Sequence, residues 1–139
     1  MRNSKKSKGS EQRVYIELAI LKEIIVTIKA SGMAIRDRLY KAIELQKIIS
    51  FDYEKKRRVV EPYHYGILGG KEQLHCYQTQ GNSNSGNIPQ WRNFQLSHMR
   101  HLRVDDTAYF DIREDYNPGN SHYTTIEKSV DQTVRRPFI

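Results

Sequence analysis

The sequence predicts an α+β fold in which one or two N-terminal helices precede a small antiparallel β-barrel of four to five strands. Apolar residues recur at helical spacing as far as Lys47, and a spacing of two replaces it from Ile48 onward. Short strand-like segments then alternate with turn residues. Helices followed by consecutive short strands are typical of the α+β class. The 139 residues suffice for one domain with a single modest core.

The helical part divides into a tail and two segments. Residues 1–10 are rich in Lys and Ser and lack apolar periodicity, which predicts a disordered basic tail. Residues 11–34 are expected to form a helix that ends at Ser31-Gly32, although the alternation in "RVYIEL" leaves a strand open. A second helix is expected over Met33–Lys47. The two apolar stripes comprise Leu18, Leu21, Ile25 and Ile28 in the first helix and Ile35, Leu39, Ala42, Ile43 and Gln46 in the second.

The barrel domain is expected over residues 35–115. The alternation of Ile49, Phe51 and Tyr53 predicts its first strand, and the charged residues 54–57 predict a turn. Further strands are expected at residues 58–68, 72–79, 91–97 and 99–104, with a long polar loop at 80–90.

Glycine and proline mark the connections between these strands. Gly69-Gly70 predicts a tight hairpin turn. Pro62 implies an edge, a bulge or a bend, because proline cannot donate to a sheet ladder. Residues 116–139 show turn chemistry without clear periodicity, so we expect an irregular segment that packs on the barrel or on a partner.

The chain carries a formal charge of +7 and has a pI of about 9.5. This excess favours an anionic partner, such as nucleic acid or a nucleotide, although solubility alone also explains it. The single cysteine, Cys76, excludes a disulfide within the chain and suits a reducing compartment such as the cytoplasm. Charged residues interrupt the apolar run from Val14 to Ile28, so a membrane span is not expected.

The order of four segments is characteristic: "LYKAIELQKIISFDY", "RRVVEPYHYGIL", "GGKEQLHCYQT" and "WRNFQLSHMRHLRV". This order resembles the WYL domain, a bacterial module of ligand-responsive regulators, over residues 35–104, about half of the chain. The most specific parts are the E-P-Y of Glu61–Tyr63 and the R-x-F-x-L of Arg92–Leu96, taken together. At the position of the family's naming tripeptide the chain has Glu72-Gln73-Leu74, and a family arginine falls on His98.

The resemblance implies an Sm-like small barrel that senses a ligand, often thought to be nucleic acid or a nucleotide, in transcriptional or defence regulation. In the family the barrel usually follows a DNA-binding winged helix. Here no helix-turn-helix pattern precedes it, so we expect a stand-alone WYL-like domain.

Basic and aromatic residues on the predicted strands form the candidate ligand site. Aromatic rings stack on bases, and arginine pairs with phosphate. The alternative is that Tyr65, Phe94 and Leu96 form the barrel core, which is the better expectation for Phe94 and Leu96. The resemblance favours the ligand site over the core for the remaining residues. Arg100 could take the place of the family arginine that is replaced by His98. The candidate residues are Arg58, Tyr63, Tyr65, Trp91, Arg92, His98 and Arg100.

The loop "GNSNSG" over residues 81–86 lies one residue away from the G-x-S-x-G of a nucleophile elbow. An elbow connects a strand to a helix, whereas this loop leads through Ile88-Pro89 to a strand, so a catalytic serine is not expected. Ser83, Asn84 and Ser85 can instead present amides and hydroxyls to an anion, or form a plain connector.

No enzyme, metal or cofactor is expected. His98 and His101 form a short pair without cysteine partners at zinc-site spacing. Cys76 on a strand is typical of a small core residue, and adjacent carboxylates do not converge on one strand face. The alternative function is a protein–protein interaction module. Its apolar N-terminal helix would then mediate homodimerisation or dock onto a separate regulator protein.

Overall fold

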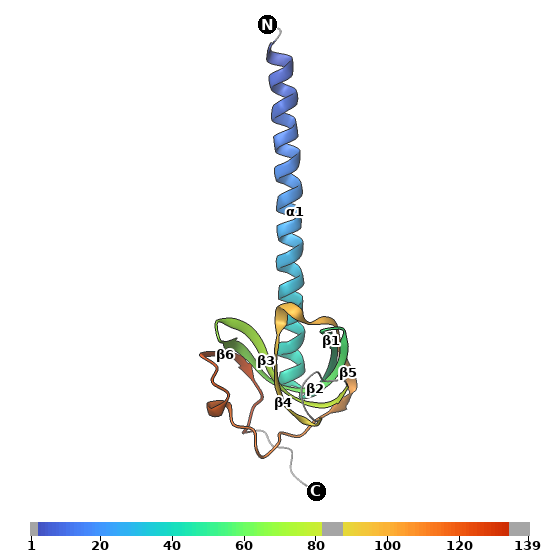
Figure 1. The fold of residues 1–139 in the computed structure, drawn as a ribbon, viewed down its shortest axis with the longest axis vertical. Coiled ribbons are helices and arrows are strands. Elements are labelled where there is room, and N and C mark those ends of the chain that lie inside the picture. Colours follow the sequence, from blue (N-terminus) through green and yellow to red (C-terminus); the bar gives the residue numbers. More distant parts are fainter. Residues whose placement is uncertain (1–2, 82–87, 134–139) are drawn as a thin grey trace. The chain divides into compact units, whose positions relative to one another are not determined.

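The computed structural model describes the backbone of residues 3–81 and 88–133 and, within its long helix, the side chains of residues 11–27 and 34–44. The chain divides into two compact units, Met1–Ala34 and Ile35–Ile139. The elements are α1 (Asn3–Glu44), β1 (Lys47–Tyr53), β2 (Lys56–Leu68), β3 (Lys71–Gly81), β4 (Gln90–Gln95), the 3-10 helix η1 (Leu96–His98), β5 (Arg100–Tyr109), the 3-10 helix η2 (Pro118–Asn120) and β6 (Thr125–Ser129) (Figure 1).

The helix α1 is continuous where the sequence predicts a tail, a helix and a second helix. It begins at Asn3 and runs through Ser31-Gly32 to Glu44, so the expected break is absent. Glycine inside a helix costs about 1 kcal/mol relative to alanine, which weakens a helix without ending it. The left-handed residue that ends α1 is Gln46, with a φ of 52°. Its side-chain Nε2 donates to the Phe110 carbonyl oxygen at 2.8 Å, which fixes the turn into β1.

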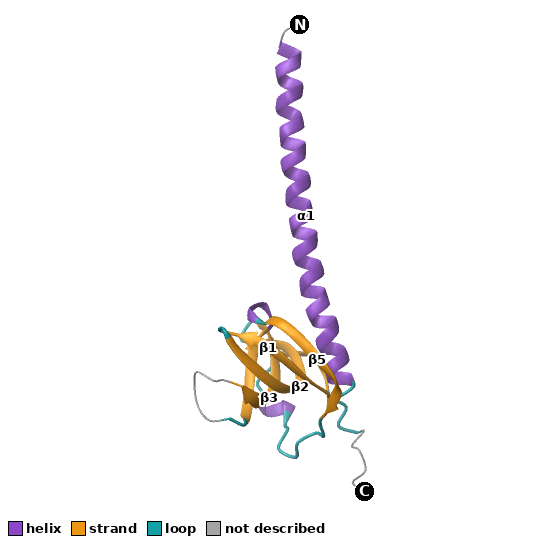
Figure 2. Ribbon diagram, turned by 90° about the vertical axis from the view of Figure 1, so that its right-hand side faces the viewer, coloured by secondary structure: helices purple, strands orange, loops and turns teal. Residues whose placement is uncertain are grey.

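All the strand pairings among the described residues are antiparallel, and the strands form one sheet in the order β4-β3-β2-β1-β5. Figure 2 shows the strands, in orange, gathered beside one another. β2 is long enough to pair with two strands along one edge. Its residues 56–60 face β1, and residues 64–67 face β6. The pairings among the described residues leave the path from β4 to β5 open, whereas the sequence predicts a closed barrel.

The sixth strand corrects the expected count of four to five. β6 lies within residues 116–139, which the sequence predicts to be irregular. Its first residues are exposed, so it lacks the buried alternation by which a strand is recognised. Pro62 lies beside a shift in the β2–β3 register between Pro62 and His64, which confirms the expected irregularity. Gly69 and Gly70 form the predicted hairpin turn, with φ of 60° and 76°.

The core lies between the sheet and the last ten residues of α1. The helical stripe predicted in the sequence is confirmed there, since Leu39, Ala42 and Ile43 are buried. Cys76 is also buried, and burial raises the pKa of its thiol, as suits a small core residue. Among the described residues, no helix has the length and apolar character that a bilayer crossing requires.

Candidate anion-binding site

Two arginines from separate strands lie on the core face of the sheet, close enough for the charge of Arg92 to act on Arg58. Arg58 lies near the start of β2, and its partner on the neighbouring strand β1 is Phe51. Arg92 lies on β4, two residues before Phe94, so both side chains leave the same face of that strand. The sheet therefore places two cationic side chains at the edge of an aromatic core.

Arg58 is almost fully buried, with 2% of its surface exposed. Its guanidinium lies over the rings of Phe94, at 5.5 Å, and Tyr53, at 5.9 Å. One terminal nitrogen donates to the Tyr53 carbonyl oxygen at 3.3 Å. The Nε atom is buried and has no hydrogen-bond partner among the described residues. A buried guanidinium is ordinarily paired with an acidic group, and Arg58 forms no ion pair within the described part of the chain.

The positive charges of Arg58 and Arg92 repel each other. Burial lowers the pKa of Arg58, and the positive charge of Arg92 lowers it further, whereas the carboxylate of Glu54 raises it to a smaller extent. Arg92 is half-buried and donates from its Nε to the Gln90 side-chain oxygen at 3.2 Å, with that amide turned to present its oxygen. An anion between the two guanidinium groups would satisfy the free Nε of Arg58 and relieve their repulsion.

An aromatic surface adjoins the arginines. Tyr53 and Phe94 lie 4.8 Å apart in an edge-on arrangement, and Tyr53 receives a hydrogen bond from the Gln95 amide at 3.2 Å. The ring of His98, at the end of η1, lies 6.0 Å from the Tyr53 ring and is exposed. Tyr53 and Phe94 were missed as site residues because their alternation also predicts core positions, and Phe94 does lie in the core.

Gly81 brings β3 unusually close to this site. A Cβ at Gly81 would overlap the carbonyl oxygen of Arg57, and the glycine has a φ of 100°. The polar loop follows directly. Its candidate residues Ser83, Asn84 and Ser85 lie outside the described residues.

The structure therefore brings together three of the predicted site residues, Arg58, Arg92 and His98. Arg100 lies nearby at the start of β5, but its guanidinium donates to the carbonyl oxygens of Ser97, at 2.7 Å, and Met99, at 3.0 Å. These two hydrogen bonds stabilise the end of η1. Arg100 therefore helps to position His98, which is the last residue of η1.

Tyr63 and Trp91 belong to a separate aromatic cluster. Tyr63 is fully buried, and its hydroxyl accepts from the Arg113 amide at 3.0 Å. The Trp91 ring stacks on His75 at 5.1 Å and donates from Nε1 to Asp115 at 2.9 Å. His75 in turn stacks on His64 across the β2–β3 pair. The rings of Tyr63, Trp91, His75 and His64 thus form a series of contacts with one another.

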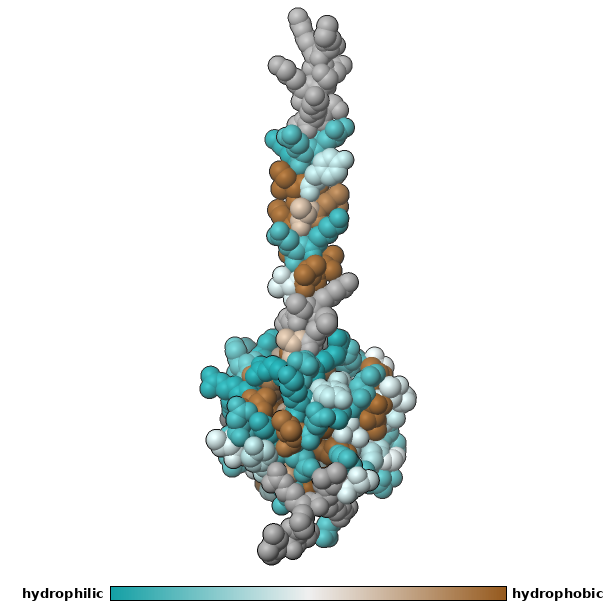
Figure 3. Space-filling model, turned by 180° about the vertical axis from the view of Figure 1, so that it is seen from behind, coloured by the Kyte–Doolittle hydropathy of each residue, from teal (hydrophilic) through white to brown (hydrophobic). Residues whose placement is uncertain are grey.

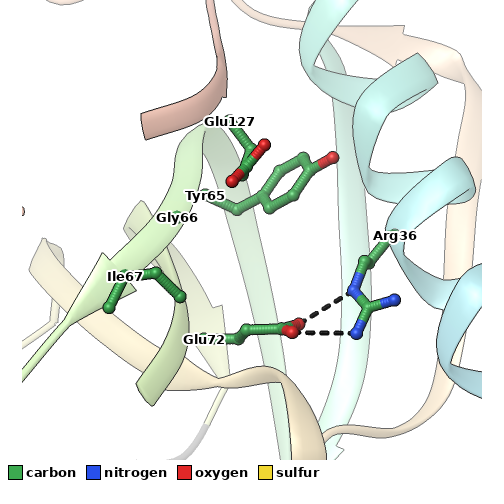
Figure 4. A pocket seen from close by; sticks show the side chains of 6 residues that line it. All are labelled: Arg36, Tyr65, Gly66, Ile67, Glu72 and Glu127. Carbon is green, nitrogen blue, oxygen red and sulfur yellow. Dashed lines mark hydrogen bonds and ion pairs between the residues drawn. The ribbon is translucent and has the colours of Figure 1, made fainter. Parts of the chain in front are cut away.

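Tyr65 lies elsewhere again, in a polar pocket of about 300 Å³ (Figure 4). Arg36 forms a two-pronged contact with Glu72 in this pocket, at 2.8 and 2.9 Å, and Glu127 adds a second carboxylate. Two carboxylates against one paired arginine disfavour an anion. Among the described residues, no three His, Cys, Asp or Glu side chains gather as a metal site.

Comparison with known proteins gives one structural likeness. The chain is similar to Proteasome accessory factor B/C (PafBC) of Arthrobacter aurescens, with 24% identity and a TM-score of 0.51 over 62% of this chain. The matched part spans 14% of the PafBC chain. No protein-family model matches the sequence, and no curated protein matches it. At this identity the likeness concerns the fold alone, and it supports a WYL-like fold.

Proposed function

We propose that this protein is a ligand-binding regulatory domain of WYL type. Its ligand is anionic, a single-stranded nucleic acid or a nucleotide, and it acts in transcriptional or defence regulation in the bacterial cytoplasm. The similarity to PafBC suggests the regulatory class. The observation that carries the ligand is the buried guanidinium of Arg58, which has an unsatisfied Nε and a second arginine beside it.

Binding follows from what each side chain offers. Arg58 and Arg92 pair with a phosphate group, because guanidinium groups form paired, charge-assisted hydrogen bonds with phosphate oxygens. The exposed ring of His98 lies 6.0 Å from the half-buried ring of Tyr53, which lies next to Arg58, and a base can stack there. Each stacked base contributes about 1–3 kcal/mol. A phosphate would also compensate the burial and the repulsion by Arg92 that lower the pKa of Arg58.

The test is fluorescence anisotropy of labelled single-stranded DNA and RNA with the full chain, at low and moderate salt. Isothermal titration with AMP tests a mononucleotide. We expect micromolar binding of at least one probe that weakens as salt rises, because phosphate contacts release counterions. Arg92→Ala should weaken binding about tenfold or more, since a charge-assisted hydrogen bond contributes roughly 1.5–3 kcal/mol.

The matched control is Arg103→Ala. Arg103 lies on β5, is exposed, and carries the same charge as Arg92. Equal weakening by both variants would mean that the net charge alone attracts the probe and would contradict the site. Absence of binding to every probe at low salt would contradict the proposed ligand class.

A further inference from the structure

The segment of α1 from Val14 to Val26 exposes large apolar side chains on several of its faces, and four of them lie on one stripe at heptad spacing. Val14, Leu18, Leu21 and Ile25 are each about half exposed, at 52%, 48%, 54% and 49%. Figure 3 shows apolar side chains over much of this part of the helix, between hydrophilic ones. An isolated helix gains little stability in water, so a helix with this much apolar surface needs a partner.

The spacing of the stripe specifies the kind of partner. The steps between its residues are four, three and four, and Ile28 continues the series in the sequence after a further three. This is the a/d pattern of a coiled coil, with Leu18 and Ile25 at a and Val14 and Leu21 at d. The central pair, leucine at d in Leu21 and isoleucine at a in Ile25, has the arrangement that favours two strands, whereas Leu18 at a departs from it.

The charges that flank the stripe specify the orientation. In this register Glu17 occupies position g and Lys22 the following position e. These positions face each other between the two helices of a parallel pair, so Glu17 of each chain meets Lys22 of the other. An antiparallel pair would set g against g and e against e, which brings no opposite charges together here. Neither residue forms an ion pair within the described part of the chain.

We infer that residues 14–25 form a parallel, two-stranded coiled coil with a second copy of this chain. The pair is self-complementary because one helix supplies both the acidic and the basic position, which suits a two-fold symmetric dimer. The inference does not rest on the proposed ligand site, which lies in the other compact unit.

The first test is the mass of the full chain in solution by size-exclusion chromatography with light scattering. We expect twice the 16.4 kDa of one chain. Leu21→Asp should give single chains. The matched control is Ile20→Asp, since Ile20 is equally exposed, at 51%, but lies outside the a and d positions. A wild-type mass of one chain, or of more than two, overturns the inference, and so does loss of the dimer in both variants.

The second test addresses orientation and does not depend on a destabilising change. Val14→Cys places a thiol at a d position, where parallel helices bring the two copies close enough for a disulfide. The native Cys76 is fully buried and does not compete. Mild oxidation should cross-link Val14→Cys and leave the control Ile16→Cys, on the outer face, as separable chains. An antiparallel pair would set Val14 near the opposite end of the segment, so failure to cross-link overturns the parallel arrangement.

Discussion

Arg113 forms a two-pronged ion pair with the buried carboxylate of Glu61. Its Nε donates to Oε1 at 2.8 Å, and its Nη2 donates to Oε2 at 3.1 Å. Glu61 also accepts from the Tyr63 hydroxyl at 3.3 Å, so the first and last residues of the E-P-Y motif are joined to the segment after β5. The Arg113 guanidinium additionally lies 3.7 Å from the Tyr77 ring. These contacts show that the motif helps to hold the fold together.

The first prediction concerns this ion pair. Arg113→Ala should lower the free energy of unfolding by about 2 kcal/mol, because a buried carboxylate loses its partner while the partial exposure of Arg113 moderates the loss. Urea unfolding followed by the fluorescence of the single tryptophan measures the change. The control is Arg36→Ala, whose exposed pair with Glu72 should contribute about 0.5 kcal/mol. Equal effects in the two variants would contradict the role given to Glu61.

The second prediction separates stability from binding. Arg58→Met should raise the free energy of unfolding of the ligand-free protein by about 1 kcal/mol, since it removes a buried charge without a counter-ion. The lost contacts with the Phe94 and Tyr53 rings oppose part of this gain. The same variant should weaken anion binding. A large loss of stability, measured by urea unfolding, would show that Arg58 is a structural residue and would count against the site.

Local patterns in the sequence predicted those parts of the fold that local chemistry determines. The Gly69-Gly70 turn needs only two residues with positive φ, and the stripe of Leu39, Ala42 and Ile43 needs only helical spacing. Long-range features were not predictable in this way. Arg113 is 52 residues from Glu61, and nothing in its surroundings in the sequence marks a partner at that distance.

Only part of the candidate site was predicted, because its other features also depend on long-range contacts. Tyr63 and Tyr65 are two residues apart on β2, and Pro62 indicated an irregularity before them without showing how the register shift would separate the two rings. The two rings consequently lie in different surroundings. Arg58 and Arg92 come from strands separated by β3, so only the strand order brings them near each other.

The third prediction concerns acid. Burial lowers the pKa of His64 to about 3, with a further contribution from the charge of His75, so the folded ring stays neutral in mild acid. The unfolded chain takes up this proton below its ordinary pKa of 6.5. The free energy of unfolding should therefore fall as pH drops from 6.5, by up to about 1.4 kcal/mol per pH unit for this group.

Urea unfolding at a series of pH values between about 5 and 7 measures the slope. His64→Gln should reduce it, because glutamine takes up no proton in either state. The variant also loses the 2.7 Å contact with the Tyr116 hydroxyl, so the slope and not the absolute stability is the readout. His122→Asn, at an exposed position, serves as the control. An unchanged slope in His64→Gln would contradict the assignment.

The fourth prediction concerns the attachment of β6. Gly66 on β2 faces Ile126 on β6, and a Cβ at Gly66 would overlap the Thr125 carbonyl oxygen and approach the Ile126 Cα to 2.9 Å. Because the clash is with backbone, no side-chain rotation relieves it. Gly66→Ala should therefore lower the free energy of unfolding by about 2 kcal/mol or separate β6 from β2.

Hydrogen exchange distinguishes these two results, since separation exposes the amides that pair β6 with β2, while a global loss speeds exchange across all strands. Gly119→Ala provides the matched control, because its new methyl group would meet only the Asn117 side-chain oxygen at 3.2 Å. Protection of the β6 amides that survives in Gly66→Ala, with unchanged stability, would mean that β6 does not approach β2 as closely as the structure places it. The short strand would then be a loosely held segment, and the irregular segment that the sequence predicts would be the better description of residues 125–129.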